Sequence, residues 1–251
     1  MKHEHMVYGI HAVQFVLKKH PETVLSLWVS EQRQDNRLQS VLTLAQQVQL
    51  RVQTVPAKTL MDLIGGEGQH QGIVAKCRTT PPWEEGDLLL ALENAVGPLG
   101  PLLILDGVQD PHNLGAILRT ADATGVFAVV LPKDRAASIT PVVRKVACGA
   151  AENVPVVTVT NLARCIEKLK TAGVWVKGAS AEASASIYET ELTGPLAIVL
   201  GAEGTGMRML TEKHCDVLFS IPMQGMVESL NVSVSAGVCL YEALRQRMSV
   251  A

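Results

Sequence analysis

Three segments in the second half of the chain each join a hydrophobic run to an expected helix through small and polar residues. They are NLGAILRTADATG (Asn113–Gly125), LGAEGTGM (Leu200–Met207) and IPMQGMVESLNVSVSAG (Ile221–Gly237). Small residues at these corners let a ligand approach the backbone closely. Each corner also carries one or two side chains that can bind or activate a ligand. We interpret the three corners as parts of one composite site, with the candidate side chains Asn113, Arg119, Glu203, Ser229 and Asn231.

Structural explanations compete with this interpretation. Asn113 follows an Asp-Pro-His turn and is well suited to cap the helix that begins there. Glu203 fits a solvated carboxylate in a tight glycine turn. Arg119 lies inside a weakly polar helical segment, which favours a cation in a functional cleft over one on a charged surface.

The third corner is the most specific. Ser229 and Asn231 open the expected last helix, and Ser233 and Ser235 follow in its first turns. These four polar side chains crowd the start of an otherwise apolar helix. Because buried polar groups need partners, we expect a ligand or a neighbouring subunit to supply them.

Other chemistries fit the sequence poorly. The glycines at 201, 204 and 206 stand in the reverse order of the dinucleotide fingerprint and follow the fifth expected strand rather than the first. His112 is the one histidine near a corner, and the chain has no GxSxG elbow. Five scattered cysteines form no CxxC pair, and no His/Cys/Asp group has metal-ligand spacing. We therefore expect reduced thiols and no metal.

The elements that position the corners are continuous runs of Val, Ile and Leu. Such runs, five or six residues long, are typical of strands covered on both faces, and helical segments separate them. The expected fold class is therefore α/β, with a parallel sheet between helix layers. A last helix is expected over 230–248. The expected strands are 102–106, 127–132, 154–159, 174–179, 196–200 and 217–222.

The first part of the chain alternates in the same way on a smaller scale. Expected helices at 10–19, 37–49 and 58–64 interleave with strands at 24–30, 51–55 and 72–77. Turn formers follow, TTPPWEEGD, and disfavour continued structure. The predicted organisation is a small α/β domain (1–78), a linker (79–98) with one short helix, and a larger domain (99–251).

Charge is distributed unevenly between these parts. Met1–Arg78 contains nine Lys/Arg against six Asp/Glu, although the whole chain has a net charge of −2. Local positive charge favours contact with phosphate, because binding releases counterions. No run approaches the roughly 18 apolar residues of a spanning helix, and the N-terminus lacks the pattern of a secretory signal. We expect a cytoplasmic protein with no membrane partner.

The corner motifs, together with DGVQDPHNLGA and VRKVACGAAENVPV, resemble the SpoU (TrmH) class of RNA 2'-O-ribose methyltransferases. The resemblance implies a SPOUT domain with a deep trefoil knot, preceded by an RNA-binding domain similar to ribosomal protein L30e. It also implies S-adenosylmethionine as cofactor and a homodimer. By motif position, the cofactor contacts would be Leu200, Gly201, Ile221, Met223 and Leu230. The catalytic set would be Asn113, Arg119, Glu203, Ser229 and Asn231.

Within the class, the chain is most similar to enzymes that methylate one guanosine ribose in the peptidyl-transferase region of 23S rRNA. The resemblance implies that Arg119 acts on the 2'-hydroxyl. A guanidinium is effectively always protonated, so we expect Arg119 to hold the adjacent phosphate and stabilise the developing alkoxide. Glu203 would position Arg119 or the partner strand, and Ser229 and Asn231 would orient the ribose and cofactor. The alternatives are a tRNA or other rRNA target, a non-catalytic RNA-binding homologue, and a nucleotide-dependent oxidoreductase.

Overall fold

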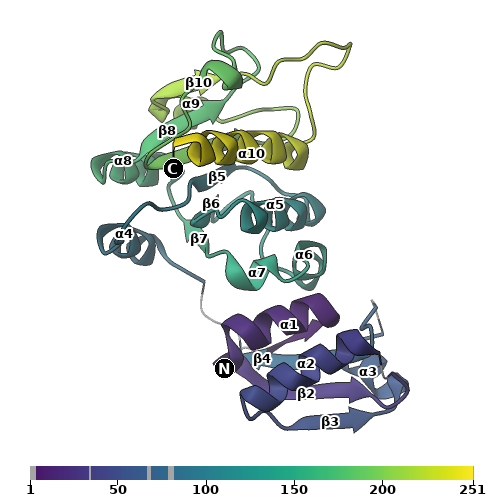
Figure 1. Ribbon diagram of the computed structural model, residues 1–251. Helices are drawn as coiled ribbons and strands as arrows, with labels where there is room; N and C mark the ends of the chain where they lie inside the picture. The colour runs from purple at the N-terminus through teal and green to yellow at the C-terminus, as the bar shows by residue number, and fades with distance from the viewer. Residues whose placement is uncertain (1–3, 34, 67–68, 79–81, 251) are drawn as a thin grey trace. The chain divides into compact units, whose positions relative to one another are not determined.

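The chain forms two compact units, Met1–Pro81 and Pro82–Ala251, each with its own sheet (Figure 1). The computed structural model describes residues 4–33, 35–66, 69–78 and 82–250. Residues 1–3 of the predicted first domain and 79–81 of the predicted linker lie outside the described residues. The remainder of the linker segment contains helix α4 (Glu85–Glu93), whose Leu88 is fully buried in a core of the second unit. Leu88, with Leu89 and Leu92 beside it, therefore packs this helix onto that unit.

The first unit contains a four-stranded sheet in the order β1-β4-β2-β3. Strand β4 pairs antiparallel with β1 and β2, whereas β2 and β3 are parallel. The predicted alternation is present, and β1 is an additional strand whose polar start conceals its pattern in the sequence. The elements are β1 (Glu4–Tyr8), α1 (Ile10–Lys19), a 3-10 turn (Pro21–Thr23), β2 (Val24–Ser30), α2 (Asn36–Gln47), β3 (Val52–Val55), α3 (Ala57–Leu63) and β4 (Ile73–Arg78).

Helices α1 and α2 cover one face of this sheet. Leu27 and Val29 of β2 and Ile73 and Ala75 of β4 pack with both helices in a single buried cluster. The side chain of Asp35 caps α2, because its Oδ1 accepts a hydrogen bond from Leu38 N at 2.9 Å. Removal of this apolar surface from water stabilises the first unit.

The second unit contains a six-stranded sheet in the order β10-β8-β9-β5-β6-β7, and every pairing in it is parallel. The predicted parallel sheet between helix layers is therefore confirmed. Besides α4, the elements are β5 (Leu102–Asp106), α5 (Pro111–Ala123), β6 (Ala128–Pro132), α6 (Pro141–Ala147), α7 (Ala150–Asn153), β7 (Val156–Val159), α8 (Leu162–Thr171), β8 (Trp175–Ala179), a 3-10 turn (Ile187–Glu189), β9 (Leu196–Gly201), α9 (Met209–His214), β10 (Val217–Phe219) and α10 (Val232–Val250).

Each face of the second sheet has its own core. One cluster joins the sheet to α5, α6 and α10, and the other joins it to α4 and α8. Along β5 the residues alternate between the two, with Leu103 in the first cluster and Ile104 in the second. This explains why the strands of this unit are continuously hydrophobic in sequence.

The strand order reverses at β5. The chain proceeds from β5 to β6 and β7 on one side, then returns to β8 and β9, and β9 pairs with the other edge of β5. Asp106, the last residue of β5, is the register partner of Gly201 at the end of β9. Open parallel sheets bind ligands at such a reversal, beyond the carboxyl ends of the strands. The first two sequence corners, after β5 and after β9, meet at this point.

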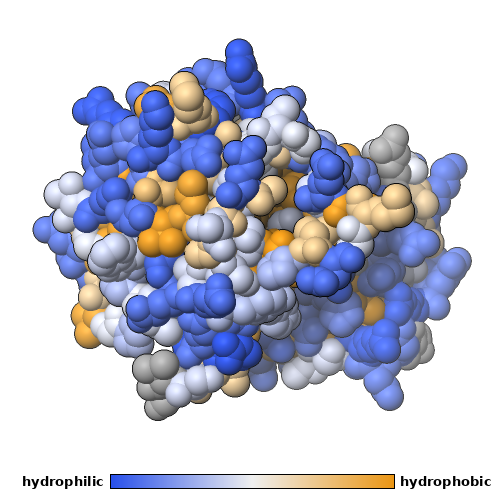
Figure 2. Space-filling view, turned by 90° about the horizontal axis from the view of Figure 1, so that it is seen from above, coloured by the Kyte–Doolittle hydropathy of each residue, from blue (hydrophilic) through white to orange (hydrophobic). Residues whose placement is uncertain are grey.

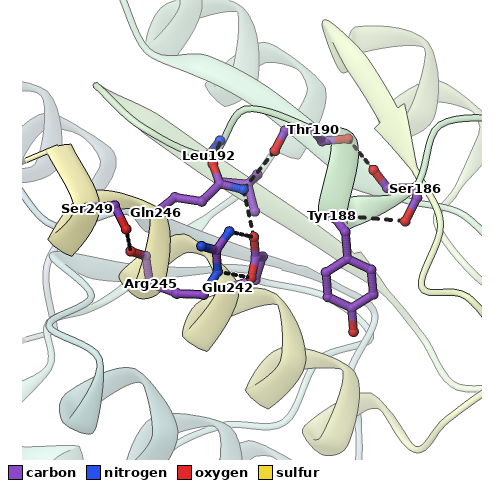
Figure 3. A network of polar contacts seen from close by, with 8 residues as sticks. All are labelled: Ser186, Tyr188, Thr190, Leu192, Glu242, Arg245, Gln246 and Ser249. Atoms are coloured by element: carbon purple, nitrogen blue, oxygen red, sulfur yellow. Dashed lines mark hydrogen bonds and ion pairs between the residues drawn. The ribbon is translucent and has the colours of Figure 1, made fainter.

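Helix α10 is held beside the sheet by a polar network (Figure 3). Gln246 accepts a hydrogen bond from Leu192 N at 2.7 Å and donates one to the Thr190 carbonyl at 3.0 Å. It also donates to the buried carboxylate of Glu242, which accepts two further bonds from Arg245 at 2.8 and 2.9 Å. The network fixes the position of α10. The first residues of this helix, directly after Asn231, belong to the third corner.

Candidate active site

Three of the predicted catalytic side chains form one hydrogen-bonded cluster. Asn231 Nδ2 donates to Asn113 Oδ1 at 3.1 Å and to Glu203 Oε2 at 3.2 Å. Asn113 Nδ2 lies 3.4 Å from the same Glu203 oxygen. The structure thus brings together one residue from each of the three corners, as the composite-site interpretation predicts.

The two asparagines are held in different ways. Asn231 stands just before α10, and its Oδ1 accepts from Ser233 N at 2.9 Å and from Ser233 Oγ at 2.5 Å, which leaves its amide nitrogen for the cluster. The prediction that Asn113 caps α5 is wrong. Asp110 is the cap, accepting from His112 N at 2.8 Å, because Pro111 is favoured at the first helical position and places the cap before it. Asn113 is therefore free to face Glu203.

The glycine-rich corner is a tight turn in which Gly201 leaves no space for a side chain. A Cβ on Gly201 would lie 2.0 Å from the Gly206 carbonyl carbon. Ala202 and Gly206 exchange backbone hydrogen bonds at 2.9 and 3.0 Å, while Gly204 and Gly206 adopt positive φ angles of 79° and 67°. This geometry presents Glu203 at the tip of the turn, where it is exposed to solvent.

A buried carboxylate that the sequence interpretation missed anchors the same turn. Asp106, only 1% exposed, accepts from Arg208 N at 2.9 Å and from Arg208 Nε at 2.6 Å. Arg208 Nη2 completes an ion pair with it. A charged residue at the end of a strand that is otherwise Leu and Ile is the signal that could have revealed this contact, since buried charges require partners.

A pocket of about 210 Å3 opens beside the cluster. All five predicted cofactor-contact residues line it, together with the predicted catalytic residues Glu203 and Ser229. Asn113 and Asn231 are not among the lining residues, but both form hydrogen bonds to Glu203, which is. The full lining is Ala179, Ser180, Ala181, Leu200, Gly201, Ala202, Glu203, Gly204, Gly206, Ile221, Met223, Glu228, Ser229, Leu230, Val232 and Ser235.

The pocket suits a ligand that is partly apolar and positively charged. Its charged side chains are Glu203 and Glu228, and no Lys, Arg or His occurs among the described residues that line it. Small residues and glycines expose backbone groups to the cavity. Within the described part of the chain, no group of three or more His, Cys, Asp or Glu is arranged to hold a metal ion.

Arg119 is the predicted catalytic residue that lies outside both the hydrogen-bonded cluster and the pocket lining. It is exposed on α5, and its Nη1 lies 3.8 Å from the Sγ of Cys148. Cys148 ends α6 with a left-handed backbone (φ 53°). Helix α6 approaches α5 closely at Gly115, where a Cβ would lie 2.6 Å from Val146 Cβ. Among the described contacts, those of Glu203 go to the asparagines and that of Arg119 goes to Cys148.

The fold and the site define a class of protein. A model of the SpoU rRNA Methylase family matches residues 100–241, and a model of the RNA 2'-O ribose methyltransferase substrate binding domain matches residues 6–83. Because the first match covers more than half of the chain, the chain belongs to the SpoU rRNA methylase family. The family prediction made from the corner motifs is confirmed.

Individual relatives narrow the comparison. The chain is 53% identical over 242 residues to the 23S rRNA (guanosine-2'-O-)-methyltransferase RlmB of Pseudomonas putida, covering 96% of each chain. The crystal structure of the SpoU methyltransferase AviRb from Streptomyces viridochromogenes shares the fold, with a TM-score of 0.79 at 22% identity over 98% of this chain and 91% of that one. The A. aeolicus TrmH/SpoU tRNA modifying enzyme covers 66% of this chain and 83% of its own, with 31% identity and a TM-score of 0.56.

No helix within the described residues is long and apolar enough to cross a bilayer.

Proposed function

We propose that the protein transfers a methyl group from S-adenosylmethionine to the ribose 2'-hydroxyl of a guanosine in 23S rRNA. The observation that carries this function is the pocket at the strand-order reversal, bordered by the cluster of Asn113, Glu203 and Asn231. The similarity to RlmB extends over 96% of the chain and so includes both units. The A. aeolicus tRNA modifying enzyme matches only 66% of the chain, which favours an rRNA target over a tRNA target.

The residues of the pocket fit this cofactor. When bound, S-adenosylmethionine supplies an electrophilic methyl group on a sulfonium cation. Glu203 and Glu228 provide negative charge around the cavity, and the absence of lining cations among the described residues avoids repulsion. Leu200, Ile221 and Leu230 offer apolar walls for a flat base. Close packing of Gly201 against Gly206 keeps the intervening backbone in one shape.

The cluster and Arg119 have separate roles in this proposal. Asn231 and Asn113 hold the Glu203 carboxylate at the pocket edge, where it and Ser229 orient the ribose. Arg119 carries a permanent positive charge and, being exposed, is accessible to RNA. It binds the phosphate next to the target and stabilises the alkoxide as the hydroxyl proton leaves to that phosphate or to water.

Several finer properties belong to the same proposal. The target lies in the peptidyl-transferase region, the first unit binds the rRNA, and the enzyme works in the cytoplasm with the segments around the pocket tied in a trefoil knot. A homodimer is supported by the exposed face of α10. Val234, Tyr241 and Met248 are 50%, 54% and 73% exposed at a seven-residue spacing, which forms an apolar stripe that a second copy would cover.

Methyl transfer to 23S rRNA tests the function directly. Purified protein is incubated with labelled S-adenosylmethionine and 23S rRNA from a strain that lacks the corresponding gene, and 2'-O-methylated positions are mapped. We expect one guanosine to be modified, with bulk tRNA unmodified in parallel. Transfer to tRNA alone would contradict the rRNA target, and S-adenosylmethionine binding without transfer to any RNA would contradict catalysis.

A further inference from the structure

The sheet of the first unit has a second face that α1 and α2 do not cover. Side chains that alternate with the buried Leu27, Val29 and Ala75 point to this face. Helix α3 packs against β2 and β4, and its Leu60 is fully buried. Val74 and Ser30 on this face are also buried, whereas six other side chains on it are half-buried or exposed and are reached by solvent. They are Met6, Tyr8, Ser26, Trp28, Gln53 and Lys76.

Two aromatic side chains occupy one row across this face. The strand register pairs Tyr8 of β1 with Val74 of β4, Val74 with Trp28 of β2, and Trp28 with Gln53 of β3. Because neighbouring strands are about 4.8 Å apart, Tyr8 and Trp28 are separated by roughly 10 Å, with the buried Val74 between them. The chain has only three Trp, three Tyr and three Phe, and two of these nine rings lie in this row.

Polar groups restrain the aromatic row and border it. Trp28 Nε1 donates a hydrogen bond to Gln53 Oε1 at 3.1 Å, which fixes the orientation of the indole. The adjacent row contains Lys76, which forms an ion pair with Glu4 at 2.5 Å and keeps 34% of its side chain exposed. Met1–Arg78, which includes all four strands of this sheet, has nine Lys/Arg against six Asp/Glu, so its charge complements a polyanion.

We propose that this face, the Tyr8–Trp28 row with Lys76, binds single-stranded RNA by stacking two bases on the aromatic rings. Aromatic side chains spread over an open sheet bind unpaired bases, because every base presents a π face. A duplex hides those faces, so the row selects single-stranded or looped segments. The inference deepens the proposed function, on which it rests, by giving the RNA-binding unit a defined surface that holds the rRNA outside the methyl-transfer pocket.

Equilibrium binding to the full-length protein tests this surface with two labelled probes, a single-stranded oligouridylate and a 23S rRNA transcript. Trp28→Leu and Tyr8→Leu keep apolar bulk but remove the ring, and each should weaken binding of both probes about 5- to 100-fold. Trp28→Phe keeps a stacking face and should stay within about threefold of wild type. The matched control is Trp175→Leu, because Trp175 is a 59%-exposed tryptophan of the second unit and should have no effect. S-adenosylmethionine affinity should be unchanged in all four variants.

Two results would contradict the proposal that this face binds RNA by stacking. One is wild-type RNA affinity in both leucine variants; the other is an equal loss in Trp28→Phe and Trp28→Leu, which would indicate packing rather than stacking. A direct measurement uses Trp83→Phe/Trp175→Phe protein, in which Trp28 is the only tryptophan. Its fluorescence should be quenched as oligouridylate binds, and an unchanged signal at saturation would also contradict stacking.

The salt dependence of RNA binding tests the role of the Lys76 ammonium group. Lys76→Gln should reduce the slope of log K against log salt by roughly 0.7, the value for one phosphate contact on a single strand. An unchanged slope would show that Lys76 does not contact a phosphate of the bound RNA. Methylation of 23S rRNA distinguishes the proposed enzymatic function from the proposed RNA-binding face. If the wild-type protein binds oligouridylate through Trp28 but methylates no rRNA, the enzymatic function is refuted and the RNA-binding face is still supported.

Discussion

The contact between Asp106 and Arg208 gives the sharpest prediction, because one buried carboxylate holds the turn that presents Glu203. Asp106→Ala removes two hydrogen bonds of 2.6 and 2.9 Å and an ion pair. Loss of one partner of a fully buried pair costs about 3–5 kcal/mol. The Arg208 side chain is 50% exposed and can be rehydrated, so we expect a cost of about 2–3 kcal/mol in the free energy of unfolding.

The reverse substitution should be at least as costly. Arg208→Ala leaves the Asp106 side chain, which has no exposed surface, as a buried charge with one backbone N–H as its partner. We therefore expect about 3 kcal/mol or more, and the double variant should lose less than the sum of the two single variants.

Urea unfolding can isolate the second unit. In a Trp28→Phe background, the remaining tryptophans, Trp83 and Trp175, both lie in that unit, so fluorescence reports its unfolding alone. The displaced turn should also raise the KM for S-adenosylmethionine more than it lowers kcat. A change below about 0.5 kcal/mol in Asp106→Ala, together with an unaltered KM, would refute the reasoning.

Three further predictions concern other parts of the second unit. Arg119→Ala should lower methyl transfer at least about 100-fold while S-adenosylmethionine affinity stays within twofold, as expected for a group that stabilises developing charge; normal turnover would remove Arg119 from the mechanism. Burial raises the pKa of the Cys165 and Cys239 thiols to about 12, so iodoacetamide at pH 8 should modify the exposed Cys148 first, and mass spectrometry showing either buried thiol modified first would contradict this. Hydrogen bonds from Arg245 hold the pKa of the Glu242 carboxyl below its usual value of 4.5. Its contribution to stability is therefore present above pH 4.5 and lost as the pH falls through the lower folded-state pKa, so the Tm difference between wild type and Glu242→Gln should shrink on acidification below 4.5; a constant difference would show that Glu242 does not titrate in this way.

The strands of the second unit could be predicted closely because they are hydrophobic on both faces. Leu102–Asp106 is predicted to the residue, and β6 begins one residue later than expected. Strand β10 and helix α10 differ more, since Ser220 to Asn231 form an irregular connection although Ile221 and Leu230 are apolar. These apolar residues line the pocket instead, so their hydrophobicity serves ligand binding rather than a strand or helix.

The meeting of the three corners could be predicted from the sequence, but the individual contacts that hold them could not. Glycine, serine and asparagine at strand ends indicated the three corners, and Asn113, Glu203 and Asn231 do meet. The sequence interpretation gave the cap of α5 to Asn113 instead of Asp110, because both residue types suit this role, although Pro111 marks the start of the helix. The sequence could not show Asp106 with Arg208, whose contact depends on two strands being neighbours in the sheet.

The position of Asn231 has a consequence for the timing of activity during synthesis. Asn113 and Glu203 are made well before Asn231, and the network that secures α10 depends on Gln246, later still. A nascent chain that has completed every strand of the sheet therefore still lacks one member of the cluster and the helix that holds it. The proposed site is therefore complete only after the last helix of the chain has been synthesised.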